Sequence, residues 1–233
     1  MRIRLIAALL ICGLAPLGRI RAQGVDPNVL REVTAVRTEV ARSNLALRQY
    51  TWTEYTEVRV KGDLKSTDAM VCRYDPSGEL SKTPVDPDQQ KQKSKAVSRK
   101  PRSRKKSDMQ DYIERAISRI HVYVPPKPQQ IDALLRDGYA TLGQSDNGKP
   151  ELRFKNYFEQ GDSLAFTYDP GTKVVLRAKI SSTLGSPEDP VSLEAVFEPL
   201  PDGINHLAST TLTAKKRKVE VKTRNVMYQR LPN

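Results

Sequence analysis

The chain has 233 residues, 39 Lys and Arg against 27 Asp and Glu, and a formal net charge of +12. That length suits one domain with a sizeable core. With 38% hydrophobic and 28% charged residues, the composition excludes a multi-span membrane protein, and two cysteines exclude a disulfide scaffold and a cysteine-ligated structural zinc.

Residues 1–22 have the layout of a secretory signal peptide. Arg2 and Arg4 precede an apolar run over residues 5–12, which is too short to cross a hydrocarbon core. We expect cleavage after Ala22 and a periplasmic mature chain comprising one domain, residues 23–233; the alternative is an uncleaved N-terminal anchor. Cys72 is then the only cysteine left. Its strand-like surroundings favour a buried, unreactive thiol in a monomer over a disulfide that links two copies into a dimer.

The first elements after the signal peptide are a helix and a strand. Asp26 and Pro27 suit a helix N-terminus, and an apolar stripe over residues 28–48 predicts the helix. From Tyr50 onward, apolar residues alternate with polar ones and predict a half-buried strand. Glu54 falls on the apolar face of that strand, and we expect it to lie at an edge near water and not as a buried polar group.

Residues 81–108 contain ten Lys and Arg, three Asp and no apolar periodicity, so they predict a basic, disordered insertion. Its basic run consists of Arg99, Lys100, Arg102, Arg104, Lys105 and Lys106. A solvated loop is the plainest interpretation of this run. Contact with an anionic membrane or cell-wall polymer is the functional one. Nucleic acid is not expected as a partner, because no aromatic residues interleave with the basic ones.

Helical spacing returns at Ser107, and a second helix is expected to precede the prolines at 125–128, with a short third helix over residues 129–136. From Tyr139 to the end the apolar period is two, which predicts an antiparallel meander with one wet face. One sheet cannot cover its own apolar face. The sequence therefore predicts an α+β fold, a curved antiparallel sheet that forms an unclosed half β-barrel covered by about three helices.

Two C-terminal segments resemble a known family. Residues 164–173 look like the Asp-Pro hairpin of the LolA-like outer-membrane lipoprotein carriers, and residues 200–204 resemble the Asp-Gly-Ile turn before their late strands. The resemblance implies an unclosed barrel with a helical lid, whose apolar cavity shields acyl chains in the periplasm. No residue matches the carriers' cargo-contacting positions, so none is carried over.

Side chains that suggest catalysis or metal binding are sparse. His121 and His206 lack metal-ligand spacing, and Ser163 lacks the second glycine of a nucleophile elbow. We therefore expect no enzyme activity, no catalytic residue, no metal and no cofactor. The inward-facing apolar residues are either core or the lining of a ligand groove; the candidate groove residues are Trp52, Val58, Phe166, Leu176, Phe197 and Met227.

The leading hypothesis is a non-enzymatic envelope protein that binds the acyl chain of a lipid or lipoprotein in an apolar groove, in trafficking to the outer membrane. The alternative is a structural or interaction protein that attaches to an anionic membrane or cell-wall polymer through its basic loop.

Overall fold

The computed structural model describes residues 25–86 and 104–232. The predicted signal peptide, its cleavage site and the part of the basic run before Arg104 lie outside these residues. The helices are α1 (Pro27–Leu47), α3 (Arg104–His121) and α4 (Pro128–Arg136). The strands are β1 (Tyr50–Val60), β2 (Asp63–Tyr74), β3 (Leu80–Pro84), β4 (Ala140–Gln144), β5 (Pro150–Lys155), β6 (Ser163–Tyr168), β7 (Val175–Thr183), β8 (Pro190–Pro199), β9 (Asn205–Ala214) and β10 (Val219–Arg230).

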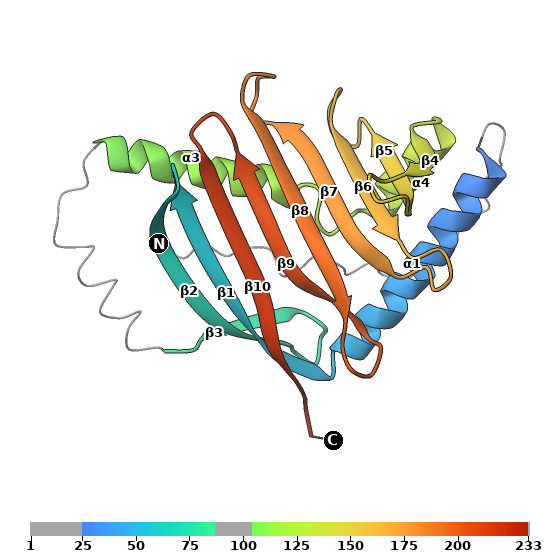
Figure 1. Cartoon of the computed structure of the whole chain (residues 1–233), viewed down its shortest axis with the longest axis horizontal. Coiled ribbons are helices and arrows are strands. Elements are labelled where there is room, and N and C mark those ends of the chain that lie inside the picture. Colours follow the sequence, from blue (N-terminus) through green and yellow to red (C-terminus); the bar gives the residue numbers. More distant parts are fainter. Residues whose placement is uncertain (1–24, 87–103, 233) are drawn as a thin grey trace.

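All ten strands form one antiparallel sheet in the order β3-β2-β1-β10-β9-β8-β7-β6-β5-β4 (Figure 1). Two meanders, β1–β3 and β4–β10, are joined where β1 pairs with β10. The sheet ends at β3 on one side and at β4 on the other, so it is not closed. The predicted fold class, an unclosed curved sheet with three helices, is confirmed.

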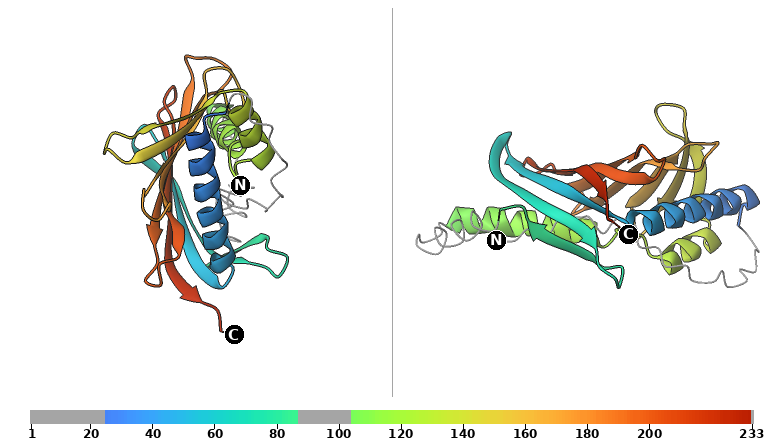
Figure 2. Two further views of the ribbon diagram at one scale, coloured as in Figure 1. Left: turned by 90° about the vertical axis from the view of Figure 1, so that its right-hand side faces the viewer. Right: turned by 90° about the horizontal axis from the view of Figure 1, so that it is seen from below.

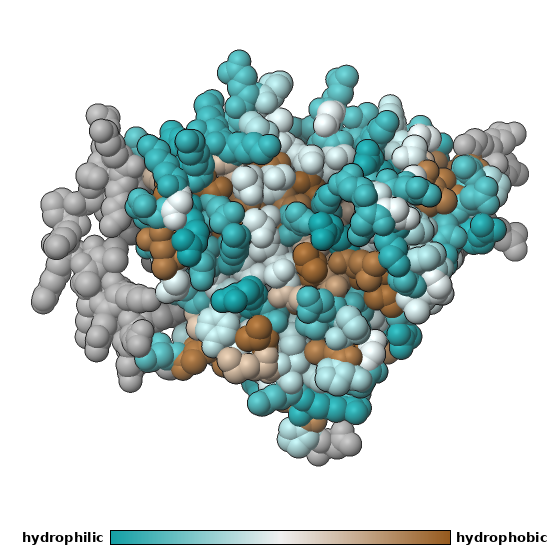
Figure 3. Space-filling model, viewed as in Figure 1, coloured by the Kyte–Doolittle hydropathy of each residue, from teal (hydrophilic) through white to brown (hydrophobic). Residues whose placement is uncertain are grey.

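The described helices lie together on one side of the sheet (Figure 2). Helix α1 packs against β4, β5 and β9, helix α3 against β7 and β8, and helix α4 against β5. None of the helices in the described ranges is long and apolar enough to cross a membrane. The opposite face of the sheet carries mostly hydrophilic side chains around smaller apolar groups (Figure 3), as expected for a meander with one wet face.

Local sequence explains where the helices begin and end. Asp26 accepts a hydrogen bond from the backbone N–H of Asn28 at 2.8 Å, and Pro27 follows in the first turn. Helix α4 is followed by Gly138, whose φ of +75° suits a glycine after a helix end. The predictions for α1 and α4 are confirmed to within one residue at each end.

The predicted insertion over residues 81–108 is wrong at both ends. Strand β3 occupies its start, and helix α3 begins at Arg104, before the expected cap at Ser107. Strand β3 could not be predicted from apolar periodicity, because it carries Ser81, Lys82 and Thr83 where alternating apolar residues would be expected. Among the described strands, it lies at the edge of the sheet and pairs only with β2. The helix starts early because Arg and Lys are good helix formers.

One shift in strand register turns a predicted inward residue away from the helices. Between the pairs Thr51↔Gln229 and Thr53↔Val226, β10 holds one residue more than β1. Met227 lies in this bulge with φ +56° and is 59% exposed, so its assignment to the apolar face is wrong.

Tyrosine hydroxyls anchor the middle and the C-terminal end of α3 to buried carboxylates. Tyr112 Oη donates to Asp189 Oδ1 at 2.6 Å, and burial raises the pKa of this phenol to about 12. Tyr123 Oη, two residues past the helix, donates to Asp162 Oδ2 at 2.5 Å and lies 2.8 Å from Ser182 Oγ. Asp189 lies directly before β8 and Asp162 directly before β6. Directional hydrogen bonds to these loops therefore position the helix, together with its apolar packing.

Helix α1 and strand β1 are anchored in the same way. Tyr168 Oη donates to Glu32 Oε2 at 2.8 Å, and Lys173 makes an ion pair with the same carboxylate at 2.8 Å. Tyr50, at the start of β1, donates to Asp202 in the turn between β8 and β9. The two turns that resemble the carriers therefore lie beside residues that locate α1 and β1.

Replacing Tyr123 by Phe removes the donor to Asp162 and leaves that carboxylate buried. We expect the Tyr123→Phe variant to lose about 2 kcal/mol of unfolding free energy, as for a hydrogen bond to a charged group, measured by urea denaturation. Tyr139→Phe is the control, because the Tyr139 side chain is 43% exposed. Equal stability of the two variants would show that the anchor contributes nothing.

Candidate ligand-binding face

A continuous row of apolar side chains crosses the face of the sheet that carries the helices. Successive strand pairings align one residue from each of seven strands, and none of the seven is more than 3% exposed. The row is Val58, Val221, Leu212, Leu193, Ile180, Leu164 and Phe154. It spans β1 to β5 without a polar side chain, and we call it the apolar row.

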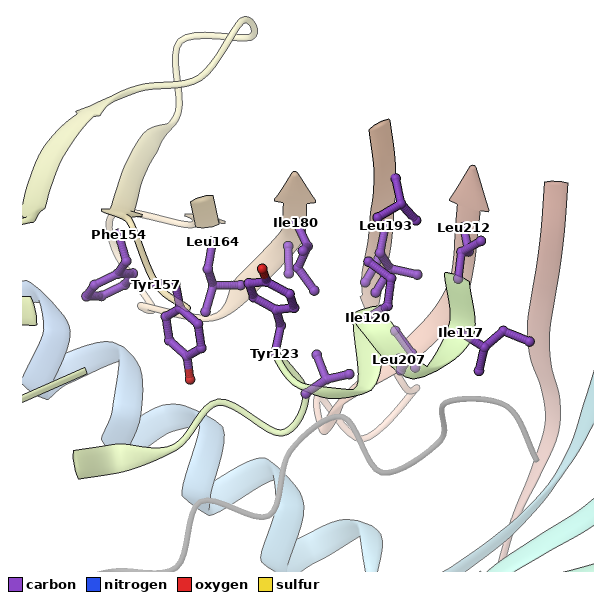
Figure 4. Packing of buried hydrophobic residues seen from close by; sticks show 14 of the residues in the cluster. Ile117, Ile120, Tyr123, Phe154, Tyr157, Leu164, Ile180, Leu193, Leu207 and Leu212 are labelled. Atoms are coloured by element: carbon purple, nitrogen blue, oxygen red, sulfur yellow. The ribbon is translucent and has the colours of Figure 1, made fainter. Parts of the chain in front are cut away.

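Helix α3 covers the middle of this row, where it packs against β7 and β8, and helices α1 and α4 pack against β5 at one end of the row. Ile117 and Ile120 lie opposite Leu193 and Leu212, and Tyr123 lies between Tyr157 and Ile180 (Figure 4). Both isoleucines belong to the same buried cluster as the row, and Ile120 is fully buried. The hollow expected from the sequence is therefore filled in this state by the protein's own helix.

Strand β1 leads from the apolar row into a different environment. Its inward side chains run from Val58 through Thr56 and Glu54 to Trp52, and all four are buried. On β10, Thr223 and Asn225 lie opposite Thr56 and Glu54, and they are buried as well. The same face is thus aliphatic at one end of β1 and polar and aromatic at the other.

Glu54 is 2% exposed and makes an ion pair with Lys82 of β3, with Oε1 and Nζ 2.6 Å apart. Burial raises the pKa of Glu54, and Lys82 partly opposes that shift. The expectation that Glu54 lies near water is wrong. Its partner Lys82 lies on β3, inside the segment predicted to be a disordered insertion. The sequence therefore does not indicate that Glu54 has a cationic partner.

Four rings gather beyond this ion pair, and we call them the aromatic group: Trp52, Tyr74, Tyr228 and His206. Trp52 stacks on Tyr228 with centroids 5.4 Å apart, and Tyr74 lies 5.6 Å from Trp52. His206 meets the edge of Tyr228 at 4.3 Å. Burial raises the pKa of Tyr228 and Tyr74 and lowers that of His206, so the group is held in its neutral form.

Cys72 lies opposite Trp52 on β2 and is fully buried as a free thiol. Burial, followed by the negative charge of Glu54, raises its pKa to about 12. The expectation of a buried thiol is confirmed, and its raised pKa is consistent with low reactivity. A dimer linked through Cys72 would require this part of the sheet to open first.

This end of the face also holds buried polar atoms that have no hydrogen-bond partner among the described residues. They come from the start of β1, the start of β9, the later half of β10 and the last turns of α1. They are Trp52 Nε1, Glu54 Oε2, Asn205 Oδ1, His206 Nδ1, Asn225 Oδ1, Ser43 Oγ and Asn44 Nδ2. Both donors and acceptors are present, so they can satisfy water or the polar part of a ligand.

The six predicted groove residues do not form one group. Val58 and Phe197 are part of the buried cluster under the helices, and Phe166 packs against that cluster. Trp52 belongs to the aromatic group, and Leu176 is half-buried next to a register shift between β6 and β7. Met227 is exposed, as described above. Sequence reasoning found the inward face and placed Glu54 on it, but it missed Lys82, Tyr228 and Asn225 as parts of the site.

The predicted anionic-contact residues are only partly described. Arg99, Lys100 and Arg102 lie outside the described residues, and Arg104, Lys105 and Lys106 form the first turn of α3. His121 is at the other end of α3, where partial burial and then the charge of Lys82 lower its pKa. Within residues 25–86 and 104–232, no group of three or more His, Cys, Asp or Glu is arranged to hold a metal ion.

No family model matches the sequence, and no curated protein does. Solved structures give distant matches. A DUF1329 family protein from Desulfovibrio piger is 7% identical, with 87% of this chain and 92% of that chain covered and a TM-score of 0.38. A putative outer membrane lipoprotein-sorting protein domain from Vibrio parahaemolyticus gives 8% identity, coverage of 85% and 93%, and a TM-score of 0.40.

A LolA superfamily protein from Nitrosomonas europaea is 5% identical, with 90% of this chain and 94% of that chain covered and a TM-score of 0.38. Its name is that of the family that the two C-terminal turns resemble. At these identities and TM-scores, the comparisons assign neither a ligand nor an activity to this chain.

The buried ion pair predicts a pH-dependent stability. The pKa of Glu54 is higher in the folded chain than its ordinary value of 4.5, so its contribution to stability falls as the pH rises above 4.5 and through the folded pKa. Lys82→Met removes the opposing cation and enlarges this loss. We expect the variant to be less stable by about 3 kcal/mol at neutral pH and by less at mildly acid pH, measured by urea denaturation.

The double variant Glu54→Gln/Lys82→Met is the matched control, because it removes both charges. It should recover most of the stability and show a flatter pH dependence than Lys82→Met. A Lys82→Met variant whose loss is the same at both pH values would contradict this account of the pair.

Proposed function

We propose that this chain is a non-enzymatic protein that binds the acyl chain of a lipid or lipoprotein on the sheet face beneath α3. The observation that carries the proposal is the change of character along β1. Val58 lies in the apolar row, and Glu54 and Trp52, four and six residues before it, lie among buried polar atoms without partners. An amphiphile with an apolar chain and a polar head matches this order.

The apolar row supplies the site for the chain. Contacts between aliphatic groups have no direction, so an acyl chain can replace the α3 side chains that cover the row. Each methylene removed from water contributes about 0.8 kcal/mol, and a long chain can therefore compete with a helix that buries a few isoleucines and tyrosines.

The polar end supplies the site for the head. Glu54 Oε2 and Asn225 Oδ1 offer acceptors, and Trp52 Nε1 offers a donor, all buried. A headgroup that carries hydroxyl, amide or ester groups can pair with these atoms. Leaving them unpaired in the unliganded state costs about 1–3 kcal/mol for each atom, and that free energy favours a ligand that pairs with them.

Helix α3 is attached in a way that suits a removable cover. Its directional contacts to the loops at the ends of the strands are at the Asp108 carbonyl, near its start, at Tyr112, in its middle, and at Arg119 and Tyr123, near its end. Arg119 pairs with Glu159 at 2.8 Å. Between these anchors, the helix meets the sheet through apolar side chains. Loss of a few hydrogen bonds therefore frees a large apolar surface.

The resemblance of two turns to the LolA-like carriers supports an acyl-chain ligand, and the signal-peptide layout of residues 1–22 supports a periplasmic setting. Trafficking of lipids or lipoproteins to the outer membrane is the role that combines both. No step of this proposal requires a catalytic residue.

The single tryptophan makes binding observable. Trp52 lies at the polar end of the face, six residues before Val58 on β1. We expect palmitate or a diacylated lipopeptide to change its emission in a saturable way in the delipidated protein. Val58→Thr keeps the side-chain shape but places a hydroxyl in the apolar row, and it should weaken binding about fivefold or more.

Val196→Thr is the matched control, because Val196 lies between two inward residues of β8 and points to the other face. It should bind as the unaltered chain does. Absence of a saturable response in the unaltered chain, or equal affinities for all three proteins, would contradict the proposal.

In this proposal, helix α3 and the acyl chain compete for the apolar row. A variant that holds α3 less tightly should therefore bind the acyl chain more tightly. Tyr112→Phe removes the hydrogen bond to Asp189 from the middle of α3. If α3 must move away for binding, the variant should bind palmitate up to about tenfold more tightly, as a 1.4 kcal/mol shift of a two-state equilibrium predicts. Tyr139→Phe is again the control. Unchanged or weaker binding by Tyr112→Phe would show that α3 stays in place.

A further inference from the structure

Two hairpin turns bring four exposed lysines together at one end of the sheet. Lys61 is in the turn between β1 and β2, and Lys215, Lys216 and Lys218 are in the turn between β9 and β10. We call these four residues the lysine tip. Among the described residues, none of them has a carboxylate within ion-pair distance.

The two turns are joined directly. The backbone N–H of Lys61 donates to the carbonyl of Lys218 at 2.8 Å, across the border of the β1–β10 pair. Both residues have a positive φ, +56° and +51°. Like charges are thereby held next to each other by the backbone, and their mutual repulsion in the free protein is relieved by an anionic partner.

Arg217 fixes the tip to helix α3. Its guanidinium donates to the carbonyl of Asp108 at 3.1 Å and lies 4.9 Å from the centre of the Tyr112 ring. The start of α3 is therefore beside the β9–β10 turn, and the sequence there reads Arg104, Lys105, Lys106.

The acids nearest in sequence leave the tip positive. Asp63 pairs with Lys65 at 3.0 Å, and Glu220 pairs with Lys222 at 3.1 Å. Both turns lie at the end of the sheet opposite to the C-terminus (Figure 1). The surface around them is hydrophilic (Figure 3). A flat anionic surface can therefore meet both turns at once.

We propose that the lysine tip is a docking surface for a bilayer that contains anionic phospholipids. Lysine heads on flexible stems follow the phosphates of a fluid surface without a fixed geometry. A nucleic acid fits less well, because the Tyr112 ring beside the tip is already covered by Arg217 and Arg115. The tip is separate from the face that binds the acyl chain, so the two proposals can fail independently.

The test is co-sedimentation of the full chain with vesicles of phosphatidylglycerol and phosphatidylcholine in equal parts, at low salt. Each lysine near an anionic surface contributes about fivefold to partitioning, so Lys215→Gln/Lys216→Gln/Lys218→Gln should lose roughly 100-fold. Lys61→Gln, in the other turn, should lose about fivefold. Pure phosphatidylcholine vesicles should bind weakly, and added salt should release the unaltered chain.

The charge-matched control is Lys127→Gln/Lys155→Gln/Lys179→Gln, which removes three lysines from other parts of the surface and should keep most of the binding. Near-ultraviolet circular dichroism confirms that each variant is folded. Full binding by the tip variants, an equal loss in the control, or equal binding to neutral vesicles would overturn the proposal. So would tighter binding to a single-stranded oligonucleotide or an anionic cell-wall polymer than to the vesicles.

Discussion

The apolar row must be kept from water, and the rest of the structure depends on that constraint. Seven strands of an unclosed sheet place aliphatic or aromatic side chains in line, from Val58 to Phe154. A sheet of this kind has no second sheet to pack against, so helices must supply the cover. Helix α3 is held by apolar contacts and by tyrosine–carboxylate hydrogen bonds in its middle and just past its C-terminal end. We propose that this combination lets an acyl chain take the place of the helix.

The second feature is a change from apolar to polar side chains along the face. Strand β1 leads from the apolar row to a group of buried polar atoms around Glu54 and Trp52. A protein that needed only stability would pair or remove these atoms, because each one left unpaired is destabilising. They are concentrated at one end of three adjacent strands, and we propose that the polar part of a ligand pairs with them.

Much of the fold could be predicted from the sequence, because helices α1 and α4 and the strand meander rest on local signals: caps, turns and periodicity. Pairing between distant segments could not. Strand β3 has no apolar alternation of its own and exists through its pairing with β2. Because β3 was not predicted, Lys82 could neither be placed in the fold nor be identified as the partner of Glu54. Met227 followed the period of two until a bulge, which depends on the register against β1, turned it outward. The candidate site was therefore predicted as a face but not as a set of contacts.

Hydrogen–deuterium exchange of the full chain, with and without palmitate, tests most directly whether α3 is a cover that an acyl chain displaces. The account predicts that saturating palmitate lowers the protection of amides in residues 112–121, while amides of β7, β8 and β9 stay protected. Equal or greater protection of α3 in the presence of bound palmitate would contradict it.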